Sequence, residues 1–368
     1  MKHIFLLLLA TLTLPCTASD KQQSEPKKPT NIIFLIGDGM GLSAVSTGFY
    51  YGDQPSVFKR FNEIGLQQTS SATHKVTDSA ASGTAMATGK LTYNGAVGVD
   101  TTKTPVQNIA ELLASMGWST GVVATSTISH ATPASFYAHV EQRSMEDEIA
   151  VQLLESEIDF FAGGGRDKFT MRADSTDILP LAAEKGFVID TSCLAAPGTL
   201  SADQKYGFLP EAGNMPSMID GRGPFLPEAT VLAISHLSQN QEGFFLMVEG
   251  SQIDWAGHAN ETEYLVGEML DFEQVIKVAL DFAEKDGNTL VVVTADHETG
   301  GFTLGPKKSK PGQKIYTDYS AIEPVFATGD HSATLIPVFA YGPGAEQFKG
   351  IYKNTEINHK MAALVGAE

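Results

Sequence analysis

The sequence is poor in cysteine. Only Cys16 and Cys193 occur among its 368 residues, and Cys16 belongs to an N-terminal apolar stretch described below. No disulfide is therefore available within the rest of the chain, and a metal site built on several thiolates is excluded. A chain without disulfides must be stabilised by a large hydrophobic core or by bound metal ions. The 42% of hydrophobic residues is enough for such a core.

Positive charge is also scarce. The chain has 25 Lys and Arg residues against 43 Asp and Glu residues, and its formal net charge is −18. Nucleic acid is therefore not expected as a partner, because proteins bind its phosphate backbone with Lys and Arg. A local cluster of lysines surrounds Pro311-Gly312, and we interpret it as a solvated hairpin or loop; it comprises Lys307, Lys308, Lys310 and Lys314.

No apolar run is long enough to span a membrane. The stretch from Ile4 to Leu14 covers about eleven residues, whereas a membrane-spanning helix needs about 20. It follows a basic start and precedes small residues, which predicts an export signal cleaved after Ala18. Lipidation at Cys16 is the alternative, although Pro15 departs from the small residue that lipoprotein signals have at that position.

The segment after the predicted signal, SDKQQSEPKKPT, is polar and contains prolines, so it cannot bury surface. We therefore expect a signal peptide at residues 1–18, a linker at 19–30 and a single catalytic domain at 31–368. The protein would be exported, either to the periplasm or as a secreted or lipid-anchored protein.

Short apolar runs alternate with amphipathic helices over the remainder of the chain. The runs are typical of strands buried on both faces of a mostly parallel sheet, and they cover residues 31–37, 119–126, 243–250, 288–295 and 334–342. Helices are predicted at 105–117, at 144–156 with a capping box from Ser144 to Asp147, and at 262–287. This alternation predicts a doubly wound α/β fold with helices on both faces of the sheet. Residues 186–230 are rich in Pro and Gly, and we interpret them as a small insertion over the sheet.

Acidic and imidazole side chains cluster where the predicted strands end. In open α/β sheets ligands bind beyond the carboxyl ends of the strands, so these positions are the candidates for a functional site. They are Asp38, His130, Thr132, Glu249, Asp254, His258, Asp296, His297 and His331. The Asp254–His258 spacing would point both side chains the same way from one helical turn.

Each of these residues has an ordinary structural explanation when taken singly, such as an Asx turn after a strand. Together they do not, because four carboxylates at one sheet edge would repel one another unless cations compensated them. Oxygen and nitrogen ligands suit Zn²⁺, and an all-oxygen subset suits Mg²⁺. Three divalent cations would leave four carboxylates and an ionised serine slightly positive, which favours an anionic substrate such as a phosphate ester.

The stretch VTDSAASGTAMATG, residues 76–89, supplies a candidate for that serine. Asp78 and Ser79 open a run of very small residues, which is typical of a helix that begins with an N-cap and packs closely against its surroundings. Capping alone would explain both residues. A helix N-terminus is also an anion site, and a hydroxyl next to a divalent cation loses its proton more easily, so Ser79 could attack phosphorus.

Five motifs in order resemble those of the alkaline phosphatases. They are VTDSAASGTAMATG, HATPASFYAHVEQR, VEGSQIDWAGH, VTADHETGGF and GDHSATLIPVFAYGPG. The resemblance runs over nearly the whole chain from about residue 31, and it is strongest to the short, cold-active bacterial members. It implies the alkaline phosphatase fold, hydrolysis of small-molecule phosphate monoesters and a homodimer.

The resemblance also implies roles for individual residues. Ser79 would be the nucleophile that forms a phosphoserine, with Asp78 beside it, and Arg143 would bind two phosphate oxygens, a task that suits its planar fork. The implied cofactors are two zinc ions and one magnesium ion. One zinc ion would be held by Asp254, His258 and His331, and the other by Asp38, Asp296 and His297. Asp38 would also reach the magnesium site, completed by Glu249 and Thr132.

Two positions depart from the enteric members of that family. His130 stands where those enzymes have Asp near the magnesium site, and Trp255 stands where they have a phosphate-contacting Lys. The first departure implies a third site that takes a different ion or binds Mg²⁺ more weakly, and the second implies faster release of phosphate. The other histidines, His74, His139, His236 and His359, lie outside the candidate set, and we interpret them as structural or surface residues.

Three other functions fit the sequence less well than a phosphomonoesterase does. A sulfatase of the same metalloenzyme superfamily would resemble one with a Cys- or Ser-x-Pro-x-Arg motif, which the sequence around Ser79 does not match. A phosphodiesterase would have no use for Arg143, which favours a terminal phosphate with free oxygens. A non-catalytic zinc- or phosphate-binding protein would need neither Ser79 nor Arg143.

Overall fold

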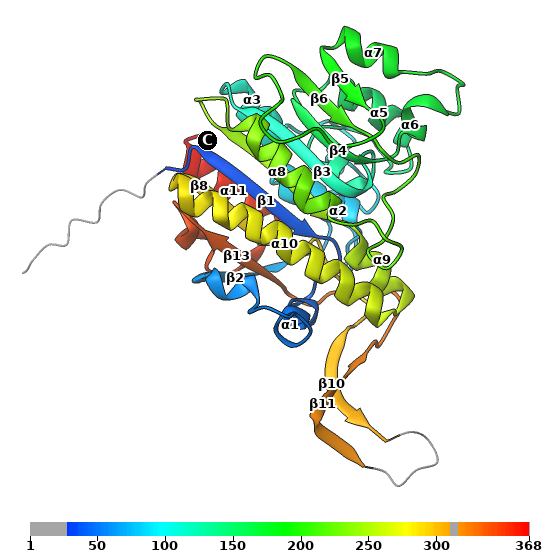
Figure 1. Ribbon diagram of the computed structural model, residues 1–368, viewed down its shortest axis with the longest axis vertical. Helices are drawn as coiled ribbons and strands as arrows, with labels where there is room; N and C mark the ends of the chain where they lie inside the picture. The colour runs from blue at the N-terminus through cyan, green and yellow to red at the C-terminus, as the bar shows by residue number, and fades with distance from the viewer. Residues whose placement is uncertain (1–27, 310–315, 368) are drawn as a thin grey trace, which may run out of the picture.

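The computed structural model describes residues 28–309 and 316–367, so the predicted signal peptide and most of the linker lie outside the described residues. A ten-stranded sheet forms the centre of the molecule (Figure 1), in the order β14-β2-β13-β8-β1-β7-β3-β4-β6-β5. Its strands are β1 (Asn31–Gly37), β2 (Glu63–Gln68), β3 (Ser119–Thr127), β4 (Phe160–Gly164), β5 (Phe187–Asp190), β6 (Lys205–Phe208), β7 (Phe244–Gly250), β8 (Thr289–Thr294), β13 (Ile336–Tyr341) and β14 (Gly350–Lys353).

The predicted parallel sheet is confirmed. β8, β1, β7, β3 and β4 are parallel neighbours, and among the described strands of this sheet β13 alone runs antiparallel to its neighbours. Every residue of β1, β7 and β8 is buried, as expected of strands covered on both faces. The five apolar runs of the sequence all form strands, with ends shifted by two residues or fewer at each end.

Helices cover both faces of the sheet (Figure 1), and each face has its own hydrophobic core. Side chains alternate along β1, so Phe34 packs in one core and Leu35 in the other. The helices are α1 (Leu42–Tyr50), α2 (Ser79–Thr88), α3 (Ile109–Ser115), α4 (Ala131–Ala134), α5 (Glu146–Glu155), α6 (Asp167–Thr170), α7 (Leu179–Glu184), α8 (Phe225–Leu237), α9 (Gln252–Ala259), α10 (Thr262–Asp286) and α11 (Thr355–Val365), with 3-10 turns η1 (Val57–Arg60) and η2 (Ala345–Phe348).

Of the three predicted helices, one has the predicted boundaries and two do not. α10 begins at Thr262 and ends before Gly287, which adopts a left-handed conformation (φ 70°) that favours glycine, so this prediction is confirmed. α3 is shorter than predicted because Asn108 caps it in a capping box with Glu111. The capping box predicted at Ser144 is wrong. α5 begins after Met145 without a side-chain cap, and three acidic residues in its first turn complement the helix dipole instead.

Two segments depart from a simple sheet covered by helices. Residues 186–230 do not lie over the sheet as expected, because they add β5 and β6 to its edge and then run into α8. Strands β10 (Thr303–Lys308) and β11 (Thr317–Val325) form an antiparallel hairpin that projects from the body (Figure 1). Lys307 and Lys308 lie on it, whereas Lys310 and Lys314 lie outside the described residues.

Two further elements complete the fold. β9 (Glu298–Thr299) pairs with β12 (His331–Ser332) in a small antiparallel sheet. In the part of the chain that the structure describes, no helix has both the length and the apolar character needed to cross a membrane.

Candidate active site

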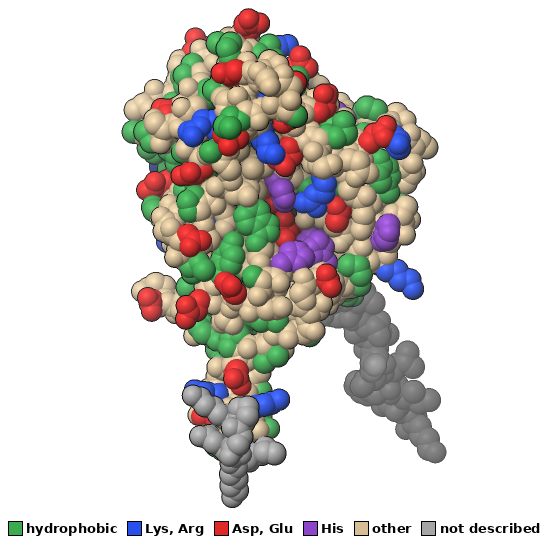
Figure 2. Space-filling model, turned by 90° about the vertical axis from the view of Figure 1, so that its right-hand side faces the viewer, with side chains coloured by type: hydrophobic (Ala, Val, Ile, Leu, Met, Phe, Trp, Pro, Cys, Tyr) green, Lys and Arg blue, Asp and Glu red, His purple; other side chains and the backbone are tan. Residues whose placement is uncertain are grey.

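The order of the central strands brings the predicted site residues into one row. β8, β1, β7 and β3 are consecutive parallel strands, so their carboxyl ends meet at the same edge of the sheet. Asp296 follows β8, Asp38 follows β1, Glu249 is the penultimate residue of β7, and His130 follows β3. Figure 2 shows histidine side chains gathered beside acidic and basic ones near the middle of one face.

Asp254, His258 and His331 converge on one point. Asp254 and His258 lie one turn apart on α9, and His331 arrives from β12. The two imidazole Nε2 atoms are 3.1 Å apart, and they lie 3.4 and 3.5 Å from Asp254 Oδ1. Each Nδ1 faces a backbone carbonyl, at Gly329 or Thr77, so Nδ1 carries the hydrogen. Both Nε2 atoms and Asp254 Oδ1 therefore face a common point, where a shared cation would take the lone pairs of the two nitrogens.

Asp38, Asp296 and His297 form a second, fully buried group. His297 Nε2 lies 3.1 Å from Asp296 Oδ2 and 3.5 Å from Asp38 Oδ1. Both Asp38 oxygens and Asp296 Oδ2 lack a hydrogen-bond partner among the described residues. His297 also stacks on His331 with ring centroids 3.5 Å apart, so the first two groups adjoin each other.

A third group consists of Asp38, His130 and Glu249, whose ligand atoms lie within 4.8 Å of one another. Thr132 Oγ1, Glu249 Oε1 and His130 Nδ1 are all buried and have no partner in the part of the chain that the structure describes. Unpartnered buried polar atoms are rare in folded proteins, and several in one place indicate a missing ion or water. The donor set of all three groups, carboxylate oxygen, hydroxyl and imidazole, fits divalent cations.

The charges of the site shift several pKa values. Burial, together with the neighbouring charges of Asp296, Asp254 and Glu249, raises the pKa of Asp38 well above its usual value. Burial likewise raises the pKa of Glu249 to about 7. Burial and then the Arg143 charge lower the pKa of His130 to about 3, so this imidazole is neutral. A neutral imidazole adds no repulsion toward a cation among these crowded carboxylates; its one lone pair lies on Nε2, which accepts from Arg143, so Nδ1 carries the hydrogen and the ring borders the cation site.

Ser79 is the first residue of α2, with Asp78 as its N-cap. Asp78 Oδ1 accepts a hydrogen bond from Ala81 N at 3.0 Å. All ten residues of α2 are buried, and one turn along Ser82 Oγ donates to the backbone carbonyl of Asp296 at 2.8 Å. Small side chains let the helix approach the site this closely. Ser79 Oγ consequently lies 3.2 Å from His297 Nε2, at the edge of the second group.

Arg143 reaches the site from the loop before α5. Its Nη1 donates to Asp78 Oδ2 at 3.2 Å, and its Nη2 donates to His130 Nε2 at 3.0 Å. Each of these nitrogens carries a second hydrogen, so the fork keeps donors beyond these two bonds. Trp255 packs edge-on against His130, with ring centroids 6.1 Å apart. The structure thus brings together all the residues predicted for the site, with His130 beside Asp38 and Glu249 in the third group.

Thr299 is a site residue that the sequence analysis missed. Its hydroxyl donates to Asp254 Oδ1 and accepts from His297 Nδ1 at 3.1 Å, so it links the first group to the second. The motif VTADHETGGF contains this threonine two residues after His297, but no role was predicted for it.

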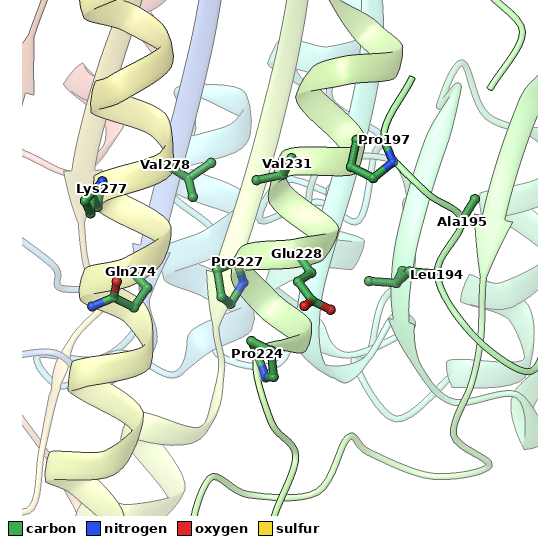
Figure 3. A pocket seen from close by; sticks show the side chains of 10 residues that line it. All are labelled: Leu194, Ala195, Pro197, Pro224, Pro227, Glu228, Val231, Gln274, Lys277 and Val278. Carbon is green, nitrogen blue, oxygen red and sulfur yellow. The ribbon is translucent and has the colours of Figure 1, made fainter. Parts of the chain in front are cut away.

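A cavity of about 660 Å³ lies apart from these residues, between α8, α10 and residues 194–197 (Figure 3). It is lined mainly by proline and aliphatic side chains, with Glu228, Gln274 and Lys277 as its polar members. It contains none of the predicted site residues. The chemistry therefore belongs to the sheet edge, where buried carboxylates and imidazoles converge.

Comparison with known proteins gives consistent relatives. A sequence model of the alkaline phosphatase family matches residues 29–325. Alkaline phosphatase 4 of Bacillus subtilis is 35% identical, over 92% of this chain and 89% of that protein. The solved alkaline phosphatase from the Antarctic bacterium TAB5 is 52% identical with a TM-score of 0.91, covering 93% of this chain and 99% of that one. The TAB5 enzyme has also been solved as a histidine-to-aspartate mutant with Mg bound in its M3 site.

A cold-active alkaline phosphatase from Shewanella sp. is 32% identical with a TM-score of 0.82, and the match covers 91% of this chain and 99% of that one.

Proposed function

The chain belongs to the alkaline phosphatase family, and we propose that it hydrolyses phosphate monoesters through a phosphoserine formed on Ser79. The observation that carries this proposal is the position of Ser79 Oγ, at the N-terminus of α2 and 3.2 Å from His297 Nε2. A helix N-terminus favours the phosphate anion, and the adjoining groups of unpartnered ligand atoms fit the metal ions on which this chemistry depends.

We propose that Asp254, His258 and His331 hold one zinc ion, and that Asp38, Asp296 and His297 hold the other. Asp38, Glu249, Thr132 and His130 would surround a third ion, for which magnesium is the proposal. When bound, these ions would supply Lewis acidity that lowers the pKa of a nearby hydroxyl or water and stabilises charge on the phosphoryl oxygens.

The residues of this chain then have distinct roles in two reaction steps. Ser79 Oγ attacks phosphorus, the Ser79 O–P bond forms, and the bond to the leaving alcohol oxygen breaks. Water then attacks the phosphoserine, which releases inorganic phosphate and restores the serine. The remaining donors of Arg143 bind two phosphoryl oxygens, and Asp78 and His130 orient its fork. The alcohol portion of the substrate is left largely to solvent.

The substrate class has a direct test. We expect a metal-saturated enzyme to hydrolyse p-nitrophenyl phosphate with a kcat/KM at least about a hundredfold higher than that for bis-p-nitrophenyl phosphate, because Arg143 needs two free phosphoryl oxygens. A preference for the diester would keep the metal site but replace the monoesterase with a phosphodiesterase. Failure to hydrolyse either ester under metal saturation would favour a non-catalytic zinc- or phosphate-binding protein.

His130 gives a second testable expectation, which concerns the metal affinity of the third site. A neutral imidazole adds no charge, whereas an aspartate would add one, so we expect His130→Asp to lower the Mg²⁺ concentration needed for half-maximal activity. A histidine-to-aspartate mutant of the TAB5 enzyme with Mg in its M3 site supports this choice of ion. Titration of chelator-treated enzyme with Mg²⁺ measures it, with exposed His359→Asp as the control. An unchanged Mg²⁺ dependence in His130→Asp would contradict the assignment.

We also propose an exported homodimer, with a signal at residues 1–18, a linker at 19–30, the catalytic domain at 31–368, and lipidation at Cys16 as the alternative to cleavage after Ala18. The apolar N-terminal sequence supports export. Ile64 on β2 and Ile351 on the edge strand β14 are 51% and 70% exposed, which supports a partner at this edge. Light scattering coupled to size exclusion would measure the oligomeric state. A monomer at micromolar concentration would contradict the dimer.

A further inference from the structure

Arg143 is carried by a segment of backbone, residues 138–143, that lies against residues 95–98. The backbone N–H groups of Val97 and Val140 donate to each other's carbonyls at 3.1 and 2.9 Å, and Arg143 N donates to the carbonyl of Gly95 at 2.7 Å. Gly95 N in turn donates to Asp78 Oδ2 at 3.1 Å, the same oxygen that Arg143 contacts. The position of the guanidinium beside Asp78 therefore depends on how segment 138–143 is attached to the fold.

His139 is the side chain that fastens this segment to the rest of the fold. Its Nδ1 lies 2.7 Å from the carbonyl oxygen of Gly98, and its Nε2 lies 2.8 Å from Glu111 Oε1. Both partners are acceptors only, and a neutral imidazole has a single N–H, so this geometry requires a proton on each nitrogen. Glu111 is itself fixed, because its other oxygen accepts from Asn108 N in the capping box of α3.

The close contact between residues 95–98 and 138–143 leaves these two segments little room to move. Gly98 has a φ of 62°, and a Cβ at this position would lie 2.0 Å from the carbonyl oxygen of Ala138. His139 N also donates to Gln152 Oε1 on α5 at 2.7 Å. The imidazole is thus held from α3 and from the Gly98 carbonyl, and the His139 backbone N–H is held from α5.

We propose that the ion pair between His139 and Glu111 is a positioning element for Arg143, and that loss of the His139 proton weakens the binding of phosphate. This inference rests on the proposed role of Arg143. Neutral His139 would turn a nitrogen lone pair toward either the Gly98 carbonyl or the Glu111 carboxylate, and the resulting repulsion would loosen segment 138–143. The nucleophile is not affected in the same way, because Ser79 is held by α2.

The charged surroundings of His139 are simple. Glu111 contacts it from α3, while α5 presents the uncharged Gln152, which connects onward to Glu148. The exposed Lys103–Glu141 pair lies farther out on the segment itself. Burial lowers the pKa of His139, but the hydrogen bonds to Glu111 and Gly98 and the Glu111 charge outweigh it, so the pKa is raised. The proton is therefore lost at a higher pH than from an ordinary imidazole.

The test compares wild type with Glu111→Gln and with Glu141→Gln as a matched control, which removes a charge from the exposed pair in the same segment. The inhibition constant of inorganic phosphate and the kcat for p-nitrophenyl phosphate would be measured on metal-saturated enzymes from about pH 7 to about pH 10. We expect Glu111→Gln to raise the phosphate inhibition constant about tenfold and to move the rise of that constant with pH to lower pH. Its kcat should change less than about twofold, and the control should match wild type.

A second measurement keeps the inference falsifiable if Glu111→Gln does not fold. In ¹⁵N-histidine-labelled wild-type enzyme, the His139 ring, assigned by loss of its signal in His139→Gln, should carry protons on both nitrogens at neutral pH. A neutral His139 ring, or an unchanged phosphate inhibition profile in Glu111→Gln, would overturn the inference. So would a parallel loss of kcat and metal content, which indicates a general structural role. A wild type without phosphatase activity would instead contradict the proposed function.

Discussion

At the scale of single residues, the proposed reaction depends most directly on Ser79. It is 2% exposed and begins a buried helix, and its hydroxyl faces His297. We expect Ser79→Ala to lower kcat/KM for p-nitrophenyl phosphate by at least about a thousandfold, because the variant has no oxygen on which to form the phosphoenzyme. Steady-state kinetics and acid-quench trapping of labelled phosphoserine would measure both quantities.

The control for this prediction is Ser82→Ala. Ser82 lies on the same helix, and its hydroxyl bonds the backbone carbonyl of Asp296 and Asn354 Nδ2. This variant should still form the phosphoenzyme, at a cost of about 1 kcal/mol in stability from the lost hydrogen bonds. If Ser79→Ala kept most of its activity, another residue or a water would have to be the nucleophile.

At the scale of single residues, the sequence could predict the identities of the site but not all of its groupings. Asp38, Glu249 and Asp296 were found because each follows or ends an apolar run. The stacking of His297 on His331 was not predictable, because His331 belongs to a small sheet formed only in the folded chain. Thr299 was missed for the same reason.

At the scale of elements, a buried cluster attaches the loop before α8 to α10. Arg222 Nη2 donates to Glu268 Oε2 at 2.6 Å and to Asp271 Oδ2 at 2.8 Å, and these side chains are 3% exposed or less. The same loop reaches the site region, because the carbonyl of Met215 accepts from Gln252 Nε2 at 2.7 Å. The cluster was absent from the sequence analysis because its members are far apart in sequence.

We expect Arg222→Met to lower the free energy of unfolding by about 3–5 kcal/mol, because it leaves two buried carboxylates without their cation. Urea denaturation at neutral pH, monitored by tryptophan fluorescence, would measure it. Lys277→Met is the matched control, since it removes a cation from an exposed pair with Asp281 on the same helix. That change should cost at most about 1 kcal/mol. Equal effects of the two substitutions would show that Arg222 does not stabilise the fold through its charge.

At the scale of the whole molecule, stability and metal content are linked through the buried carboxylates. Burial raises the pKa of Glu249 from 4.5 to about 7. A carboxyl whose pKa is raised in the folded state stabilises the fold fully below the unfolded value, and this contribution is lost as the pH rises through the folded value. Without metal ions, Glu249 therefore makes the fold less stable between pH 4.5 and about pH 7.

The variant Glu249→Gln isolates this effect, because the histidines that titrate in the same range are common to both proteins. In chelator-treated protein, we expect Glu249→Gln to gain stability over wild type between pH 4.5 and about 7, by up to roughly 3 kcal/mol. In metal-loaded protein the order should reverse, because the amide is a weaker ligand for Mg²⁺. Thermal unfolding at both pH values would measure it, with exposed Glu155→Gln as control. The same rank order with and without metal would contradict a cation at Glu249.

The sequence by itself determined the class of fold, the strand and helix identities, and the residues gathered where strands end, because these follow from local periodicity and from the chemistry of each side chain. The family motifs added the expected roles. Only the tertiary structure decided the strand order, which sets Asp296, Asp38 and Glu249 side by side, and the contacts of Arg143 with Asp78 and His130. It also decided the roles of β5 and β6, of the Arg222 cluster and of His139. These depend on residues far apart in sequence, whose partners no local pattern specifies.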